Sequence, residues 1–462
     1  MGGKTGLLVI GTKKKQTEAL FGTRFALSLR IIKVELSGMY LKSILWAGVL
    51  WACVSTAGAQ SAREEIKTDV RLSASNYCAY REPQGVRLTP APSGYEPFYL
   101  SAYARHGSRF QINPNEYREP LRVLQQADSV GALTPLGQQV LAVVDSVARM
   151  ANGRYGELTP LGARQHRGIA ARMYARFPQV FEGRADINAR STPVVRCILS
   201  MLNECCTLQG LNPQLQVTTD ASAHDMYYMN DEFNRVTRYR GEKAAQASLR
   251  DFRSRQVKPD RLMRSLFADT AYVSRHVKGG RLMGQLFDLA SNMQSLDTSL
   301  DLYNLFTTDE CYDLWLRDNY DWYVNYGPSP LTQGKLPYTQ ANLLRNILDT
   351  ADTCVARRQN GATLRFGHEV CVLPLACLME LDSCGYATTC ADSVAMSWRN
   401  YRIFPMASNI QMVFYRNKQN DILVKVLLNE REVRLPVPTR RAPYYKWTDV
   451  RAYYRQKLAQ AD

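Results

Sequence analysis

The stretch LSAYARHGSRF, residues 100–110, joins an alternating apolar segment to two arginines that bracket a histidine. Alternation of apolar with other side chains is the period of a half-buried strand. The strand is expected to end at Arg105 and His106, where Gly107 leaves room for a ligand to approach the backbone. Arg105 and Arg109 carry the planar guanidinium fork that binds phosphate at two points. We therefore expect a phosphate site at the end of this strand.

Two later segments also read as short strands that end beside charged side chains. Residues 186–192 (DINARST) are followed by a helix whose first turn carries Arg196. Residues 362–366 (ATLRF) run into a glycine followed by His368 and Glu369. Because α/β proteins place ligand groups at the carboxyl ends of strands, we expect these side chains to meet those of the first strand.

These three strand ends supply the parts needed to hydrolyse a phosphate monoester. A neutral imidazole, that of His106, can attack phosphorus if arginines offset the charge repulsion, and a carboxylic acid can protonate the leaving alkoxide. Water then hydrolyses the phosphohistidine. Since the arginines and the second histidine take the electrostatic role of a metal, we expect neither metal nor cofactor. The sequence also lacks the CxxC pairs and HExxH helix typical of zinc sites.

The order and spacing of these motifs resemble those of the clade 2 histidine phosphatases, which include histidine acid phosphatases and phytases. Within that group the chain is most similar to the multiple inositol polyphosphate phosphatases. The resemblance runs from about Gly94 to Pro436. The motifs that carry it are Arg105-His-Gly-Ser-Arg109, Leu158-Thr-Pro-Leu-Gly162 with Gln165-His166, Arg190-Ser-Thr with Arg196 and Ser200, Phe366-Gly-His-Glu369, and Val426-Leu-Leu-Asn-Glu430.

The resemblance implies that His106 is the phosphorylated nucleophile and that Glu369 is the proton donor. It assigns the phosphate pocket to Arg105, Arg109, Arg196 and His368. The donor departs from the family pattern, because the common acid phosphatases have aspartate directly after the histidine and inositol polyphosphate phosphatases often have His-Ala-Glu. This chain has His-Glu-Val. Glu369 thus stands in the aspartate's position with a side chain one methylene longer.

Two further histidines are weaker candidates. The dipeptide His224-Asp225 could compete for the donor role, but no apolar strand precedes it and no apolar helix follows. We interpret it as a structural turn. His166 lies on the apolar stripe of a helix that opens at Thr159-Pro160, and we expect a buried, hydrogen-bonded histidine that supports the core.

The resemblance implies an α/β fold with a mixed central sheet flanked by helices, like phosphoglycerate mutase, and an inserted all-α cap domain. Composition agrees, because residues 225–338 look helical, aromatic and densely basic. That basic run is either a solvated helix face or a set of cations overhanging the site. Residues 409–415 and 422–428 are expected to form a closing hairpin. We divide the chain into a non-native extension at 1–38, a signal peptide at 39–59, a first core part at 60–224, the helical cap at 225–338 and a second core part at 339–462.

The start of the chain predicts export. Residues 39–59 combine an early lysine, a short apolar run and Ala-Gly-Ala before Gln60, as in a secretory signal. The apolar run is too short for a stable membrane span. We expect a periplasmic or extracellular protein, with a lipid anchor at Cys53 as the lesser alternative. The ten other cysteines are compatible with disulfides, and Cys384 and Cys390 could close a small covalent loop.

The expected substrate is a small molecule that carries several phosphates, because a basic cap over a phosphate site suits a polyanion. Inositol hexakisphosphate comes first and 2,3-bisphosphoglycerate second. A broad-specificity acid phosphatase is the nearer alternative, and a secreted protein that captures phosphorylated ligands with little turnover is the other. The net charge of +16 does not indicate nucleic-acid binding, since the basic run lacks a recognised domain of that kind. The oligomeric state stays open.

Overall fold

The computed structural model describes residues 61–230 and 235–460, called the described chain below. The proposed extension at 1–38, the signal at 39–59 and Cys53 lie outside the described residues. Within the described chain no helix combines the length and apolar character needed to cross a membrane.

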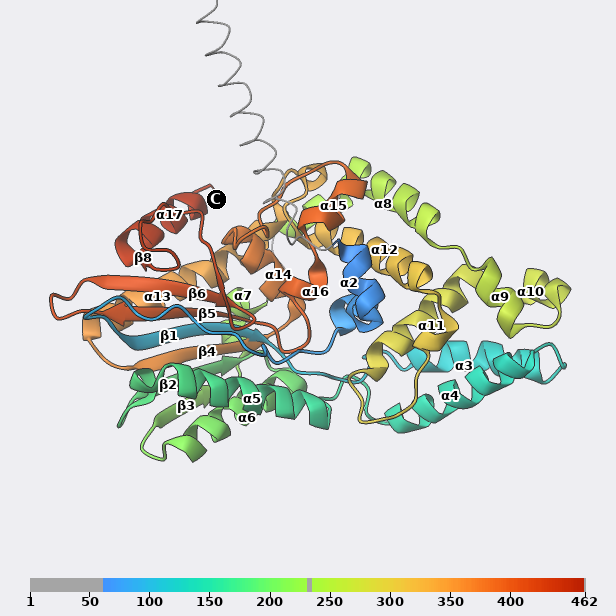
Figure 1. The fold of residues 1–462 in the computed structure, drawn as a ribbon, viewed down its shortest axis with the longest axis horizontal. Helices are drawn as coiled ribbons and strands as arrows, with labels where there is room; N and C mark the ends of the chain where they lie inside the picture. The colour runs from blue at the N-terminus through green and yellow to red at the C-terminus, as the bar shows by residue number, and fades with distance from the viewer. Residues whose placement is uncertain (1–60, 231–234, 461–462) are drawn as a thin grey trace, which may run out of the picture. The chain divides into compact units, whose positions relative to one another are not determined.

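One mixed sheet organises the chain, in the strand order β3-β2-β4-β1-β5-β6-β7, with β8 paired to β6 (Figure 1). The strands are β1 Glu96–Arg105, β2 Asp186–Ser191, β3 Gln216–Asp220, β4 Gly361–Gly367, β5 Asn409–Arg416, β6 Ile422–Leu428, β7 Arg431–Val433 and β8 Tyr445–Lys446. From β3 to β1 neighbouring strands are parallel, whereas β5 is antiparallel to β1 and to β6. The mixed sheet and the closing hairpin of β5 and β6 are thereby confirmed.

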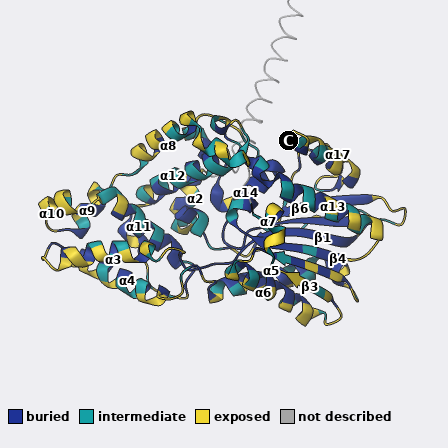
Figure 2. Cartoon of the chain, turned by 180° about the vertical axis from the view of Figure 1, so that it is seen from behind, coloured by how far each residue is buried: buried dark blue, intermediate teal, exposed yellow. Residues whose placement is uncertain are grey.

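The prediction that β1 is half-buried is wrong, because all of its residues after Glu96 are buried. Tyr99 and Tyr103 point into one core cluster, and Leu100 and Ala102 point into another. The alternation in the sequence therefore separates two apolar cores, not a core from solvent. Figure 2 shows the central strands mostly in the dark blue of buried residues.

Helices cover both faces of the sheet, so β1 is buried on each of its two faces. On one side lie α5 (Pro160–Arg176) and α6 (Val195–Leu211), whose apolar residues pack with Leu100 and Ala102. On the other lie α13 (Ala341–Arg357), α14 (Glu369–Leu378) and α17 (Trp447–Leu458). Helices α4 (Pro135–Ala151) and α5 each begin with a threonine cap followed by proline, as the Thr-Pro-Leu-Gly sequence at 134–137 and again at 159–162 predicts.

The described residues between β3 and β4 form helices and contain no strand of the sheet. Apolar residues from Leu262 to Trp315 share a third core cluster with helices α3 and α4, which precede β2 in the chain, whereas Leu249 and Phe252 belong to the cluster of Tyr99. The remaining helices are α2 Ala62–Thr68, α3 Asn115–Asp128, α4 Pro135–Ala151, α7 Met226–Met229, α8 Lys243–Gln256, α9 Asp260–Leu266, α10 Thr270–His276, α11 Gly279–Met293, α12 Thr308–Tyr326, α15 Ala391–Ser397 and α16 Asn400–Ile403. The domain boundaries given above stay a prediction.

The ten cysteines of the described chain form no disulfide with one another, which corrects the prediction of a covalent loop. Cys384 is buried in the apolar core beside α14, whereas Cys390 is exposed at the start of α15. The two thiols face different surroundings, although they are close in the sequence.

Candidate active site

The carboxyl ends of β1 and β4 lie side by side, with Arg105 paired to Gly367 in the sheet register. The residue after each strand is a histidine, and the rings of His106 and His368 lie 5.7 Å apart between centroids. Nε2 of His106 lies 3.7 Å from Oε2 of Glu369. The strand ends therefore bring these sequence-predicted residues together.

The backbone and the ring of His106 are both held in place. Its N–H donates to the Gly367 carbonyl and its own carbonyl accepts from the Ala407 N–H, each at 2.9 Å. Its Nδ1 lies 2.9 Å from the Gly107 carbonyl. Because a carbonyl only accepts, we assign the proton to Nδ1, which leaves the lone pair on Nε2. Burial, reinforced by the nearby arginines, holds the pKa of His106 well below its usual value and keeps the ring neutral.

The loop that follows β1 packs backbone to backbone on the start of α5. A Cβ on Gly107 would lie 2.5 Å from the Gly162 carbonyl oxygen, so only glycines allow this crossing. Thr159 accepts from Gly162 N–H and donates to the Ser108 carbonyl. Gln165 accepts from the Ser108 N–H at 2.9 Å and donates to its hydroxyl at 3.0 Å. The Leu-Thr-Pro-Leu-Gly motif and Gln165 thus position the loop of His106.

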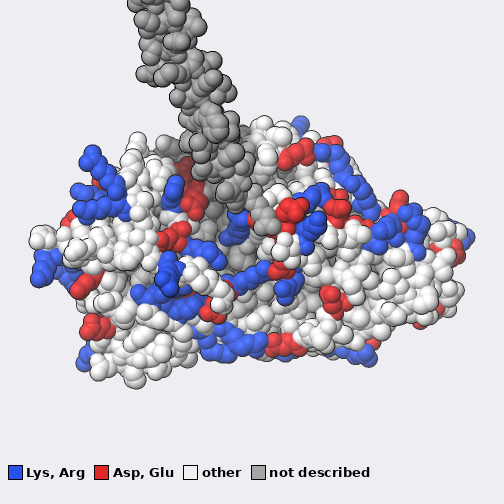
Figure 3. All heavy atoms as spheres, viewed as in Figure 1, with Lys and Arg blue, Asp and Glu red and all other residues white. Residues whose placement is uncertain are grey.

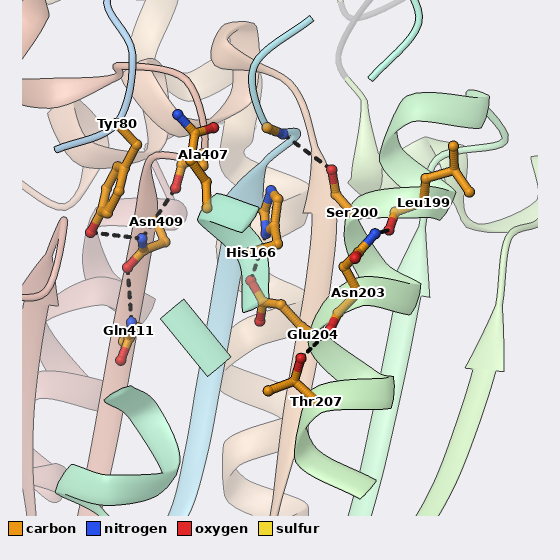
Figure 4. Close-up of polar contacts among 12 residues, drawn as sticks. Tyr80, His166, Leu199, Ser200, Asn203, Glu204, Thr207, Ala407, Asn409 and Gln411 are labelled. Carbon is orange, nitrogen blue, oxygen red and sulfur yellow. Dashed lines mark hydrogen bonds and ion pairs between the residues drawn. The ribbon is translucent and has the colours of Figure 1, made fainter. Parts of the chain in front are cut away.

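Figure 4 shows His166 pointing at Glu204 of α6. Its Nδ1 lies 2.7 Å from a Glu204 carboxylate oxygen, and both side chains are buried. The expectation of a core histidine is confirmed. Ser200 lies on α6, as Glu204 does, and its hydroxyl accepts from the Gly107 N–H at 3.1 Å. The sequence motif contains Ser200 but did not reveal that it positions the loop of His106.

The arginines leave hydrogen-bond donors directed at no protein atom. Arg105 and Arg109 are buried, and Arg196 at the start of α6 is half-buried. Within the described chain, the buried site nitrogens without a hydrogen-bond partner are Arg105 Nε and Nη2, His106 Nε2, Arg109 Nε and Arg196 Nε. Of these, Arg105 Nε is ion-paired with Glu369. Since buried donors are nearly always satisfied, this cluster fits an anion with several acceptor oxygens.

Glu369 is the first residue of α14, and its carboxylate lies 3.0 Å from Arg105 Nε. Burial alone would raise the pKa of Glu369, but the charges of Arg105 and Arg109 outweigh it and lower the pKa to about 2. Glu369 is therefore ionised in the free protein. Burial also lowers the pKa of His368 to about 4, and Thr192 Oγ1 lies 3.2 Å from His368 Nε2.

His106, His368 and Glu369 offer ligand atoms within 4.8 Å of one another, a spacing that could hold a metal ion. A cation there would face the charges of Arg105 and Arg109 at short range in a buried setting, which is costly. The donor set fits an anion better.

The competing dipeptide lies in a short 3-10 turn, Ala223–Asp225, with His224 exposed and Asp225 3.5 Å from Arg190. This agrees with a structural turn. Several cations of the basic run pair with carboxylates of α12, among them Arg253 and Arg261. Those two belong to an ion-paired helix surface, and on the face in Figure 3 basic and acidic side chains are interspersed.

Comparison with known proteins identifies a family and a shared fold. Residues 100–429 match the family model described as histidine phosphatase superfamily (branch 2). A solved structure of Bifidobacterium longum multiple inositol polyphosphate phosphatase, in complex with inositol hexasulfate, has a TM-score of 0.69 at 19% identity, covering 83% of this chain and 97% of that one. The phytase from D. castellii has a TM-score of 0.58 at 13% identity, covering 84% and 85%. At these identities the likeness shows a shared fold. The search of curated proteins found no match.

Proposed function

The chain belongs to branch 2 of the histidine phosphatase superfamily and is a phosphoric monoester hydrolase, and we propose that it acts on inositol polyphosphates through a phosphohistidine on His106. The observation that carries the proposal is the cluster of buried, unpartnered donors around a neutral Nε2. Phosphate oxygens would satisfy the nitrogens of Arg105, Arg109 and Arg196. This would hold phosphorus in reach of the lone pair.

In the first step the Nε2–P bond forms while the bond from phosphorus to the ester oxygen breaks. The leaving oxygen takes the proton of Glu369. Although this carboxylate is ionised in the free site, a bound phosphate dianion neutralises the arginines that depress its pKa, so the carboxylate can carry a proton in the complex. In the second step water attacks phosphorus, Glu369 takes the water's proton and the P–N bond breaks.

The choice of inositol polyphosphates is supported by the relative from B. longum, whose structure holds inositol hexasulfate. The basic run gives less support, because Arg253 and Arg261 are occupied by acidic partners. The alternatives are a broad-specificity acid phosphatase, a 2,3-bisphosphoglycerate phosphatase and a binder with little turnover.

The test is hydrolysis of p-nitrophenyl phosphate and inositol hexakisphosphate at acidic pH in the presence of EDTA. We expect the parent to hydrolyse both substrates and His106→Ala to lose nearly all activity. No phosphate should be found on the His106→Ala protein after quenching under alkaline denaturing conditions. His224→Ala, a change of the same kind at an exposed histidine, should match the parent. Loss of activity on chelation, or an active His106→Ala, would contradict the mechanism. A steep preference for inositol hexakisphosphate separates the proposal from a generalist.

Export belongs to the same proposal and rests on the signal pattern at 39–59. Expression with the native leader should yield a mature chain that begins at Gln60, read by N-terminal sequencing of the exported fraction. Retention of the leader on a cytoplasmic product would contradict it.

A further inference from the structure

Residues 61–78 lie ahead of the region matched by the family model, yet they contact two of the site arginines. This segment, the N-terminal strap, comprises α2 and the 3-10 helix η1 (Val70–Tyr77). We propose that the strap is a positioning element of the active site, with Tyr77 orienting Arg109 and the Asn76 carbonyl orienting Arg105. The inference rests on the proposed function, in which both arginines hold phosphate.

Arg105 is held by the strap through the backbone. Its Nη1 donates to the Asn76 carbonyl at 2.7 Å and to the Phe404 carbonyl at 2.9 Å. Its Nε is ion-paired with Glu369 at 3.0 Å, so two of the three guanidinium nitrogens are held by protein groups. Because the guanidinium is planar, these contacts also set the direction of Nη2, which has no partner within the described chain. Moving the Asn76 carbonyl would therefore turn the donor that phosphate needs.

Arg109 is held by the strap through an aromatic ring. Its Cζ lies 5.5 Å from the centroid of Tyr77, within the range of a cation–π contact. The hydroxyl of Tyr77 points to Glu116 at 3.5 Å, a long contact. The ring is thus the part of Tyr77 that acts on Arg109, and a phenylalanine would keep it.

The strap is clamped to the segment 399–406, which also supplies the second carbonyl for Arg105. The Ser75 hydroxyl accepts from Asn400 Nδ2 at 2.8 Å, and the Cys78 carbonyl accepts from the Met406 N–H at 2.8 Å. Ser75 has φ 55° and ψ −122°, a conformation that a serine adopts only when its surroundings enforce it.

Glu65 of α2 binds the other end of the strap to the same segment. Its carboxylate binds Arg399 Nη1 at 2.5 Å, the Tyr401 hydroxyl at 2.5 Å, and Arg402. All three partners lie on the 399–406 segment. Glu64, one residue earlier in the same helix, is exposed and serves as a matched control.

The experiment compares the full chain with Tyr77→Phe, Tyr77→Leu, Glu65→Gln and Glu64→Gln. We measure kcat and KM for p-nitrophenyl phosphate, the inhibition constant of inorganic phosphate, and the urea midpoint. Tyr77→Leu should raise KM and the inhibition constant about fivefold with little change in kcat, because the ring supports phosphate equally in substrate and transition state. Tyr77→Phe should match the parent. Glu65→Gln should lower kcat/KM by about fivefold or more, while Glu64→Gln should not.

The outcomes separate the two proposals. A parent that neither hydrolyses the ester nor binds phosphate overturns the proposed function and this inference with it. If the parent is active and Tyr77→Leu has the same KM and the same inhibition constant for phosphate, the strap's role is overturned and the proposed function is not. A Tyr77→Phe as impaired as Tyr77→Leu has the same consequence. Should Glu65→Gln fail to fold, the Tyr77 pair decides the question.

Discussion

Replacing Gly162 by alanine should separate the loop after β1 from the start of α5. The new Cβ would lie 2.3 Å from the Ser108 carbonyl oxygen and 2.8 Å from the Ser108 nitrogen. Such contacts are essentially never closer than 3.0 Å, so the loop or the helix must move by about 0.7 Å. Both contacting atoms belong to the backbone and cannot rotate away.

The cost of that movement follows from its size and its place. Overpacking of this kind lowers the free energy of unfolding by about 1–3 kcal/mol. Ser108 lies two residues after His106, so the same shift moves the nucleophile relative to the arginines. A misplacement near 1 Å reduces a rate by about 100-fold, and we expect a loss of that order in kcat for Gly162→Ala.

Gly210→Ala in α6 is the matched control. Gly210 is exposed, and a Cβ there would meet no heavy atom within 4 Å. Alanine should therefore gain up to about 1 kcal/mol from helix propensity and leave kcat unchanged. Urea unfolding by circular dichroism and hydrolysis of p-nitrophenyl phosphate report the two quantities. A Gly162→Ala protein as stable and as active as Gly210→Ala would refute the reasoning.

Three further predictions follow from single side chains. Glu369→Gln should slow hydrolysis of inositol hexakisphosphate by about 10²–10⁴ and that of p-nitrophenyl phosphate far less, because nitrophenolate leaves without a proton; equal losses would argue against an acid. Attack needs the neutral form of His106, whose pKa lies well below 6.5, so kcat/KM plotted against pH should begin its acid-side decline below pH 6.5; a decline centred at or above pH 6.5 would contradict this. Glu430→Gln should lower the free energy of unfolding in urea by about 3 kcal/mol, since this buried carboxylate pairs with Arg172 and Arg176; an unchanged midpoint would contradict the pairing.

Much of the site was predictable because its residues follow local patterns. Apolar residues alternate with others both before Arg105 and in residues 362–366 before His368, and each alternation defines a strand. The end of each strand then places the side chains that follow it. Parallel pairing of β1 and β4 then brings those ends together. The glycine of the Thr-Pro-Leu-Gly motif was visible too, although its contact with Gly107 was not.

The tertiary structure decided what depends on residues far apart in the chain. Burial of β1 on both faces reflects helices that arrive before and after the strand, which no period within the strand can report. The ionised state of Glu369 follows from Arg105, more than 250 residues earlier, and the same arginine is oriented by the carbonyls of Asn76 and Phe404. A sequence by itself determines local conformation and the identity of reactive groups. Charge, orientation and solvent access at a site are set by neighbours that only folding brings within a few ångströms, because electrostatic and packing energies depend on distance in space.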